Sequence, residues 1–192
     1  MYSTRPSAGR GVTLVELVVF IALVGVAMAG VFAAFNTFTA ASADPQVRKQ
    51  ALAIAESLLE EIELMPFTFC DPDDDANAAT ATSTAGCAST VEVIGAEGGE
   101  TRYNAAKPFD NVSDYDGLAM NSGSGGIKDI TNATITGLGA YSALVTITQV
   151  GTAFGLADNT DALRISVHVT GPAGVDLTLE GYRARYSPNT LP

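Results

Sequence analysis

The stretch that decides the fold reads GRGVTLVELVVFIALVGVAMAGVFAAF and runs from residue 9 to residue 35. It joins a short basic leader, which ends at Gly11, to a run from Leu17 to Ala43 that carries no charge. About 20 apolar residues at about 1.5 Å each are enough to cross the hydrocarbon core of a bilayer. We therefore predict a transmembrane helix near the N-terminus.

One carboxylate, Glu16, stands at the start of this apolar helix. A charge within a membrane helix costs a few kcal/mol on insertion scales, so such a residue is a functional candidate and needs a partner. Arg5 and Arg10 precede the helix with no acidic residue among them, and the positive-inside rule then keeps the N-terminus cytoplasmic and exports the rest. The alternatives are a plain signal anchor and a buried core helix, although no second segment matches this hydrophobicity.

Behind the apolar run the sequence predicts an amphipathic helix that ends near Pro66. Asp44 is the expected N-cap, with Pro45 at the first helical position. Residues 12–65 together are expected to form one long helix, or two stacked helices with a joint at Asp44–Pro45. The apolar stripe of the second half must face a sheet. Its members recur at helical spacing: Val47, Ala51, Ile54, Leu58, Ile62 and Met65.

The last third of the chain predicts antiparallel strands. Residues 141–150 are rich in β-forming side chains, and residues 163–170 and 175–180 alternate apolar with polar side chains around a Gly-Pro turn. Residues 91–94 and 133–138 are weaker strand candidates. The expected fold class is therefore α+β, with a long N-terminal helical spine packed on an antiparallel β-sheet.

Composition agrees with a small exported protein. The chain has 192 residues and a formal net charge of -11, which argues against binding to nucleic acid. Its two cysteines, Cys70 and Cys87, both follow the predicted anchor. Two cysteines in an exported domain most simply form one disulfide, and closing a loop of this length should stabilise the fold by about 3 kcal/mol.

The junction between leader and helix resembles the processing site of the type IV pilin and pseudopilin superfamily. Gly11 is followed by Val-Thr-Leu-Val-Glu, although the family usually has Phe where this chain has Val12. The resemblance implies that a prepilin peptidase cuts between Gly11 and Val12 and methylates the new amine, and that Glu16 serves assembly. It also implies a leader at 1–11, a transmembrane and assembly helix at 12–40, an amphipathic half at 41–66 and a globular head at 67–192.

Further blocks resemble the D-type minor pilins of mannose-sensitive haemagglutinin (MSHA) pili: residues 43–62, 67–74, 109–117 and 179–182. This implies a minor subunit that helps to initiate or cap a type IV pilus. Its partners would be other pilin subunits, prepilin peptidase and the inner membrane, from which it would pass to the cell surface. The alternatives are a tip adhesin or ligand-binding module using the loops at 70–130, and a minor pseudopilin of a type II secretion system.

Glu16 should find its partner on another chain. The leader arginines leave on cleavage, and the next cation in the sequence is Arg48. Cleavage creates an amine at Val12, and methylation keeps its charge. In a filament that amine could pair with Glu16 of a neighbouring subunit and set its register. The alternative is that Glu16 extends to the membrane interface.

Two acidic loops are candidate Ca²⁺ sites, because hard oxygen ligands suit that ion. The first contains Asp71, Asp73, Asp74, Asp75 and Asn77, of which Asp73, Asp75 and Asn77 are the expected ligands. The second contains Asp110, Asn111, Asp114 and Asp116. Neither fits the twelve-residue calcium loop, and the alternative is a solvated acidic turn. No other cofactor is expected. The lone His168 alternates with core residues and should face solvent without a nucleophile nearby, so we expect no catalytic residues and no enzymatic activity.

Overall fold

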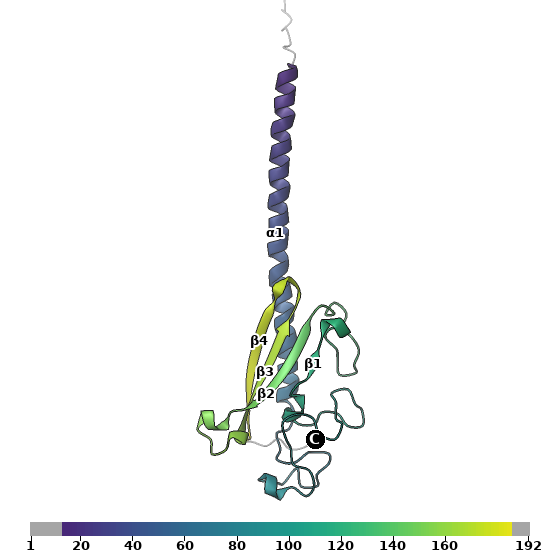
Figure 1. The fold of residues 1–192 in the computed structure, drawn as a ribbon, viewed down its shortest axis with the longest axis vertical. Helices are drawn as coiled ribbons and strands as arrows, with labels where there is room; N and C mark the ends of the chain where they lie inside the picture. The colour runs from purple at the N-terminus through teal and green to yellow at the C-terminus, as the bar shows by residue number, and fades with distance from the viewer. Residues whose placement is uncertain (1–12, 186–192) are drawn as a thin grey trace, which may run out of the picture. The chain divides into compact units, whose positions relative to one another are not determined.

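In a computed structural model of this chain, the structure describes residues 13–185, with side chains for residues 13–35 and 45–185. The chain divides into two compact units, Met1–Pro45 and Gln46–Pro192, and we call the second the globular unit. Helix α1 (Leu14–Glu63) belongs to both units (Figure 1). The helix is continuous through Pro45, so the prediction of a separate N-cap at Asp44 was wrong because the backbone there is already helical.

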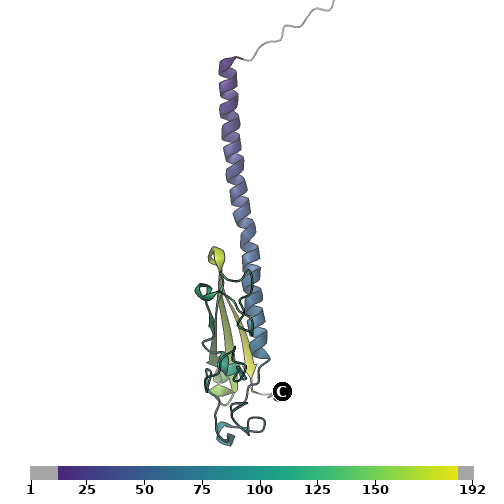
Figure 2. The same cartoon turned by 90° about the vertical axis from the view of Figure 1, so that its right-hand side faces the viewer.

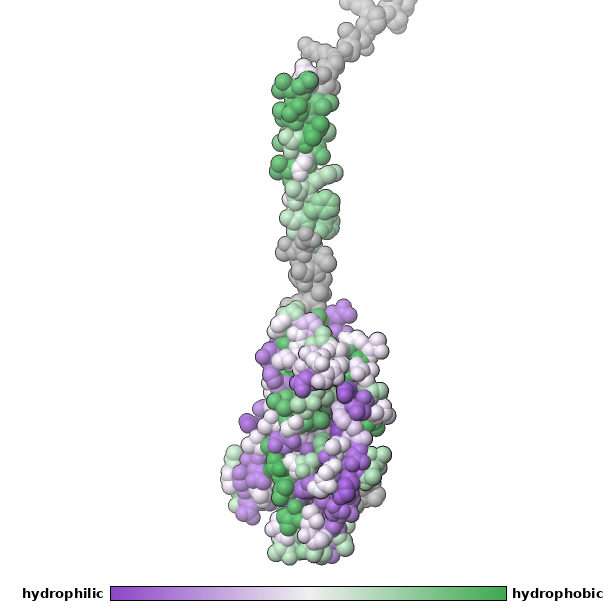
Figure 3. Space-filling view, turned by 45° about the vertical axis from the view of Figure 1, so that its right-hand side comes forward, coloured by the Kyte–Doolittle hydropathy of each residue, from purple (hydrophilic) through white to green (hydrophobic). Residues whose placement is uncertain are grey.

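The first part of α1 is apolar on every side. Leu14–Phe35 forms a stretch of 22 residues with a mean hydropathy of 2.7, and none of it is buried within the protein. Figure 3 shows this stretch as an almost uniformly hydrophobic surface. A helix without a polar face suits a lipid environment. This one is long and apolar enough to span a membrane.

The globular unit contains a four-stranded antiparallel sheet in the order β1-β2-β3-β4. The bounds of the strands are Ala119–Met120 for β1, Ser142–Gln149 for β2, Ala162–Thr170 for β3 and Asp176–Ala184 for β4. The three longer strands lie where the sequence predicted strands, and β3 and β4 keep the predicted alternation. His168 on β3 is about 40% exposed and its Nε2 lies 2.9 Å from Asp176 Oδ1, so it faces solvent as expected.

Within the globular unit, the last turns of α1 lie against one face of the sheet (Figure 2). The predicted apolar stripe is buried there, as Ile54, Leu58 and Ile62 show, and it meets buried side chains from β2 and β3. Gly181 on β4 permits the close approach, because a Cβ at this position would overlap Glu63 Oε1 and lie 2.7 Å from Leu59 Cδ1. The core is therefore a two-layer α/β interface.

The two weaker strand predictions were wrong. Residues 91–94 and 133–138 make only isolated bridges, between Cys70 and Val91 and between Lys128 and Thr134. Their other backbone bonds are irregular: the Glu92 N–H donates to the Phe69 carbonyl, the Ile135 N–H to the Ile127 carbonyl and the Ala133 N–H to the Asp129 carboxylate. β1 pairs with β2 at this edge instead. Its two residues are too few to show an alternating pattern in the sequence.

Candidate functional site

The first turn of α1 is organised around Glu16. Its backbone N–H donates to Thr13 Oγ1 at 3.3 Å, so Thr13 caps the helix. Glu16 thus occupies the third helical position, where a carboxylate interacts favourably with the helix N-terminus. Among the residues that the structure describes, none forms an ion pair with Glu16. Gly11 and Val12 lie outside the described residues, so the cleavage site stays a prediction.

The predicted disulfide is present. Cys70 and Cys87 are bonded with an S–S distance of 2.05 Å and a Cα–Cα distance of 5.5 Å. The bond closes a loop that begins a few residues after the end of α1 and contains the first acidic segment. It also fixes the backbone beside Asp71, which follows Cys70 in the chain.

Asp75 and Asn77, two of the three expected cation ligands, are used to close this loop. Asp75 accepts hydrogen bonds from the backbone N–H groups of Asn77, Ser89 and Thr90 at 2.6–3.0 Å. The N–H groups, led by that of Ser89, hold the pKa of Asp75 well below its usual range. The Asn77 amide donates to the carbonyl of Gly86 at 2.8 Å. Both side chains therefore have structural partners already.

The third expected ligand, Asp73, joins a different group. Carboxylate oxygens of Asp71, Asp73 and Asp110 all lie within 4.8 Å of one another. Asp71 is only 1% exposed, whereas Asp73 is exposed to solvent. The structure thus brings the two acidic loops of the sequence together, in the loop region below the sheet in Figure 1. We call this group the aspartate triad.

A second group adjoins the aspartate triad. Carboxylate oxygens of Glu92, Glu97 and Asp114 also lie within 4.8 Å of one another. Asp114 connects the two groups, because its Oδ2 accepts the backbone N–H groups of Asp110 and Asn111 at 2.9 and 2.7 Å. These six carboxylates and that of Glu100, which is 5% exposed, form what we call the acidic pocket.

Several carboxyl groups of the acidic pocket have raised pKa values. Burial, followed by the charges of Asp114 and Asp71, raises the pKa of Asp110 to about 7. Burial, followed by Asp114 and Asp110, raises the pKa of Glu100 to about 8. Burial also raises the pKa of Glu97 to about 7 and that of Glu92 to about 10. The pocket therefore holds protons more tightly than free carboxylates would, or else it needs a cation.

The basic side chains nearby are engaged elsewhere. Lys107 pairs with Asp74 at 2.9 Å at the surface. Arg102 pairs with Glu61, and the Arg185 guanidinium lies over the rings of Phe67 and Phe69. Within the described part of the chain, no ion pair reaches the carboxylates of the acidic pocket.

In a buffer free of divalent cations, the globular unit should become less stable as the pH rises from about 5 to about 8. The folded pocket binds more protons than the unfolded chain, since the pKa values of Glu97, Glu100 and Asp110 are raised to about 7–8 from ordinary values of 3.8–4.5. This stabilisation is complete below the ordinary values and is lost as the pH passes the raised ones. Urea midpoints measured at intervals across this range will show the slope.

The Glu100→Gln variant is the control for this pH dependence. It removes one titrating group without removing the side chain, so its slope between pH 5 and pH 8 should be shallower. A wild-type midpoint that stays constant or rises over this range would contradict the description of the pocket.

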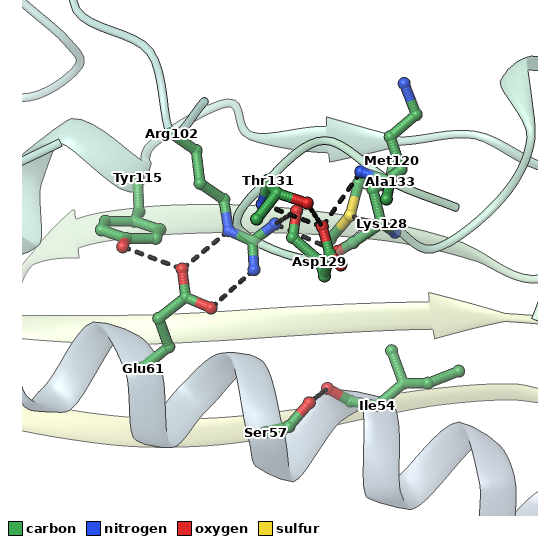
Figure 4. A network of polar contacts seen from close by, with 10 residues as sticks. All are labelled: Ile54, Ser57, Glu61, Arg102, Tyr115, Met120, Lys128, Asp129, Thr131 and Ala133. Carbon is green, nitrogen blue, oxygen red and sulfur yellow. Dashed lines mark hydrogen bonds and ion pairs between the residues drawn. The ribbon is translucent and has the colours of Figure 1, made fainter. Parts of the chain in front are cut away.

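Glu61 and Arg102 form a second, half-buried polar network, which connects the loops to α1 (Figure 4). Arg102 Nε and Nη2 donate to the two oxygens of Glu61 at 2.7 and 2.6 Å, and the Tyr115 hydroxyl donates to Glu61 at 3.0 Å. Arg102 Nη1 donates to the carbonyls of Lys128 and Asp129.

Comparison of the chain with protein-family models, with curated proteins and with solved structures finds no match. The functional conclusion therefore depends on the residues themselves. Sequence reasoning had missed Glu92, Glu97 and Glu100 as members of the acidic pocket. The available signal was three glutamates between residues 91 and 100 without a basic residue among them.

Proposed function

We propose that this chain is a minor subunit of a type IV pilus, anchored in the inner membrane before assembly and incorporated into the filament through α1. The observation that carries the proposal is Glu16. It is a carboxylate in the first turn of a 22-residue apolar stretch, and no described residue forms an ion pair with it. A charge in such a place needs a partner from outside the chain.

The N-terminal amine of a neighbouring pilin subunit is the partner that fits best. After removal of the leader, the chain would begin two residues before Leu14, where α1 starts. Its methylated amine would then stand at the end of an apolar helix, as Glu16 does. Pairing the two charges between subunits would oppose misaligned stacking, because a shifted subunit would leave both charges unpaired in an apolar environment.

The globular unit would supply the part of the subunit outside the membrane. It presents a loop region closed by the Cys70–Cys87 disulfide, next to a sheet. We propose that these loops form the exposed end of the subunit when it starts or caps a filament.

The Glu16→Ala variant tests the assembly role. The variant is expressed in the source organism after deletion of the native gene. There we expect it to insert in the membrane normally. Its amount in filaments sheared from the cell surface should fall at least about tenfold, because one partner of a buried ion pair is missing. Immunoblots of the membrane and sheared fractions give both amounts.

Two further variants make the result specific. Glu56→Ala removes an exposed carboxylate from the same helix and should leave incorporation unchanged. Glu16→Gln keeps the size of the side chain without its charge and should fail as Glu16→Ala does. Incorporation of Glu16→Gln at the wild-type level would refute charge pairing.

A further inference from the structure

Asp71 of the aspartate triad and the adjoining Asp114 are each held in place through one carboxylate oxygen, while the other oxygen has no hydrogen-bond partner. Asp71 Oδ1 accepts the backbone N–H groups of Asp73 and Asp74 at 3.1 and 3.0 Å, which fixes the orientation of the carboxylate. Its Oδ2 is buried and has no hydrogen-bond partner. Asp114 is held in the same manner through Oδ2, and its Oδ1 is likewise buried and unpartnered.

Two more carboxylates of the acidic pocket have unsatisfied oxygens. Asp110 Oδ2 and Glu100 Oε1 are both buried without a partner. Glu100 is 5% exposed, and burial together with the charges of Asp114, Asp110 and Asp71 raises its pKa. Burying carboxylate oxygens without a donor is costly, and so many in one place indicates a missing positive charge.

A solvent-facing hollow adjoins the aspartate triad at Asp73 and Asp110. It has a volume of about 510 Å³, and Asp73 and Asp110 line it together with the rings of Pro72, Pro108 and Phe109. Asp73 itself is exposed. An ion could therefore reach Asp73 and Asp110 from the surface, and a carboxylate oxygen of Asp71 lies within 4.8 Å of theirs.

We propose that the aspartate triad of Asp71, Asp73 and Asp110 binds one Ca²⁺ ion, with Asp114 and Glu100 of the acidic pocket adding negative charge around it. All the ligands are oxygens, which favours a hard cation. Ca²⁺ accepts six to eight oxygen ligands in flexible geometry, whereas Mg²⁺ is usually held by one or two carboxylates and several waters. A dense set of carboxylates on irregular loops therefore suits Ca²⁺.

The ion would join segments that are far apart in the sequence. Asp71 and Asp73 lie in the loop closed by the Cys70–Cys87 bond, whereas Asp110 lies just before the short helix at Val112–Tyr115. Ca²⁺ would fasten these two loops together at the end of α1. This differs from the ligand set Asp73, Asp75 and Asn77 that the sequence suggested.

Calorimetric titration of the full chain in detergent micelles, after treatment with EDTA, tests the proposal. CaCl₂ should bind at one site per chain with a dissociation constant of about 10⁻⁴ M or lower, and MgCl₂ should bind at least tenfold more weakly. Asp71→Asn and Asp110→Asn should each weaken Ca²⁺ binding at least tenfold. Asp74→Asn, which removes a neighbouring carboxylate that pairs with Lys107, should bind as wild type does.

Thermal unfolding in EDTA shows whether each variant is folded. Without Ca²⁺, Asp110→Asn should unfold at the wild-type temperature or above it, because it removes repulsion between carboxylates. Saturating Ca²⁺ should raise the midpoint of wild type and of Asp74→Asn but leave that of Asp110→Asn nearly unchanged. Absence of Ca²⁺ binding by folded wild type would overturn the proposal, and so would equal affinities for Ca²⁺ and Mg²⁺ or wild-type affinity in folded Asp110→Asn.

Discussion

Replacing Glu61 by alanine is expected to lower the free energy of unfolding of the globular unit by about 3–5 kcal/mol. The substitution leaves the guanidinium of Arg102, whose side chain is only 5% exposed, without its carboxylate. It also removes the acceptor of the Tyr115 hydroxyl, which is buried against α1. The two remaining bonds of Arg102 go to backbone carbonyls, which supply no compensating charge. Urea denaturation of the full chain in detergent micelles measures the loss.

A matched variant and a double variant separate charge from packing. Glu60→Ala removes the adjacent, exposed carboxylate of the same helix and should change the free energy of unfolding by no more than about 0.5 kcal/mol. Combining Glu61→Ala with Arg102→Met should recover much of the stability, since no charge is then buried unpaired. A loss below about 1 kcal/mol in Glu61→Ala alone would show that this network does not fasten the loops.

The elements with a clear period could be predicted from the sequence. The uncharged run after Glu16 and the apolar spacing of Ile54, Leu58 and Ile62 identify both halves of α1. Strict alternation along 163–170 and 175–180 identifies β3 and β4. These patterns succeed because each depends on neighbours within one element, which contact the same surface.

The acidic pocket could be predicted only in part, because contacts between distant segments form it. The sequence shows two acidic loops but not that Asp71 and Asp110 approach each other. Nor does it show that Asp75 turns inward to accept backbone N–H groups, as an aspartate in a tight loop readily does. Glu92 and Glu97 were overlooked because their partner, Asp114, is provided by another loop.

The Gly11→Val variant is expected to abolish processing of the N-terminus. The proposed peptidase must bring the peptide bond after Gly11 into a cleft at the membrane face, where a residue without a side chain fits. A branched valine would obstruct that approach, so the whole population of the variant should keep its leader and remain 11 residues longer. Substitution of the preceding Arg10 by lysine, which preserves the charge, is the matched control and should leave cleavage intact.

The central claim is that this chain is a processed filament subunit, and the intact mass of the chain from native membranes tests it most directly. We predict a mature chain that begins at Val12 and carries one additional methyl group on its amine, alongside an uncut chain from the Gly11→Val variant. A native chain that still begins at Met1, or that is cut within the apolar stretch after Glu16, would contradict the proposed function.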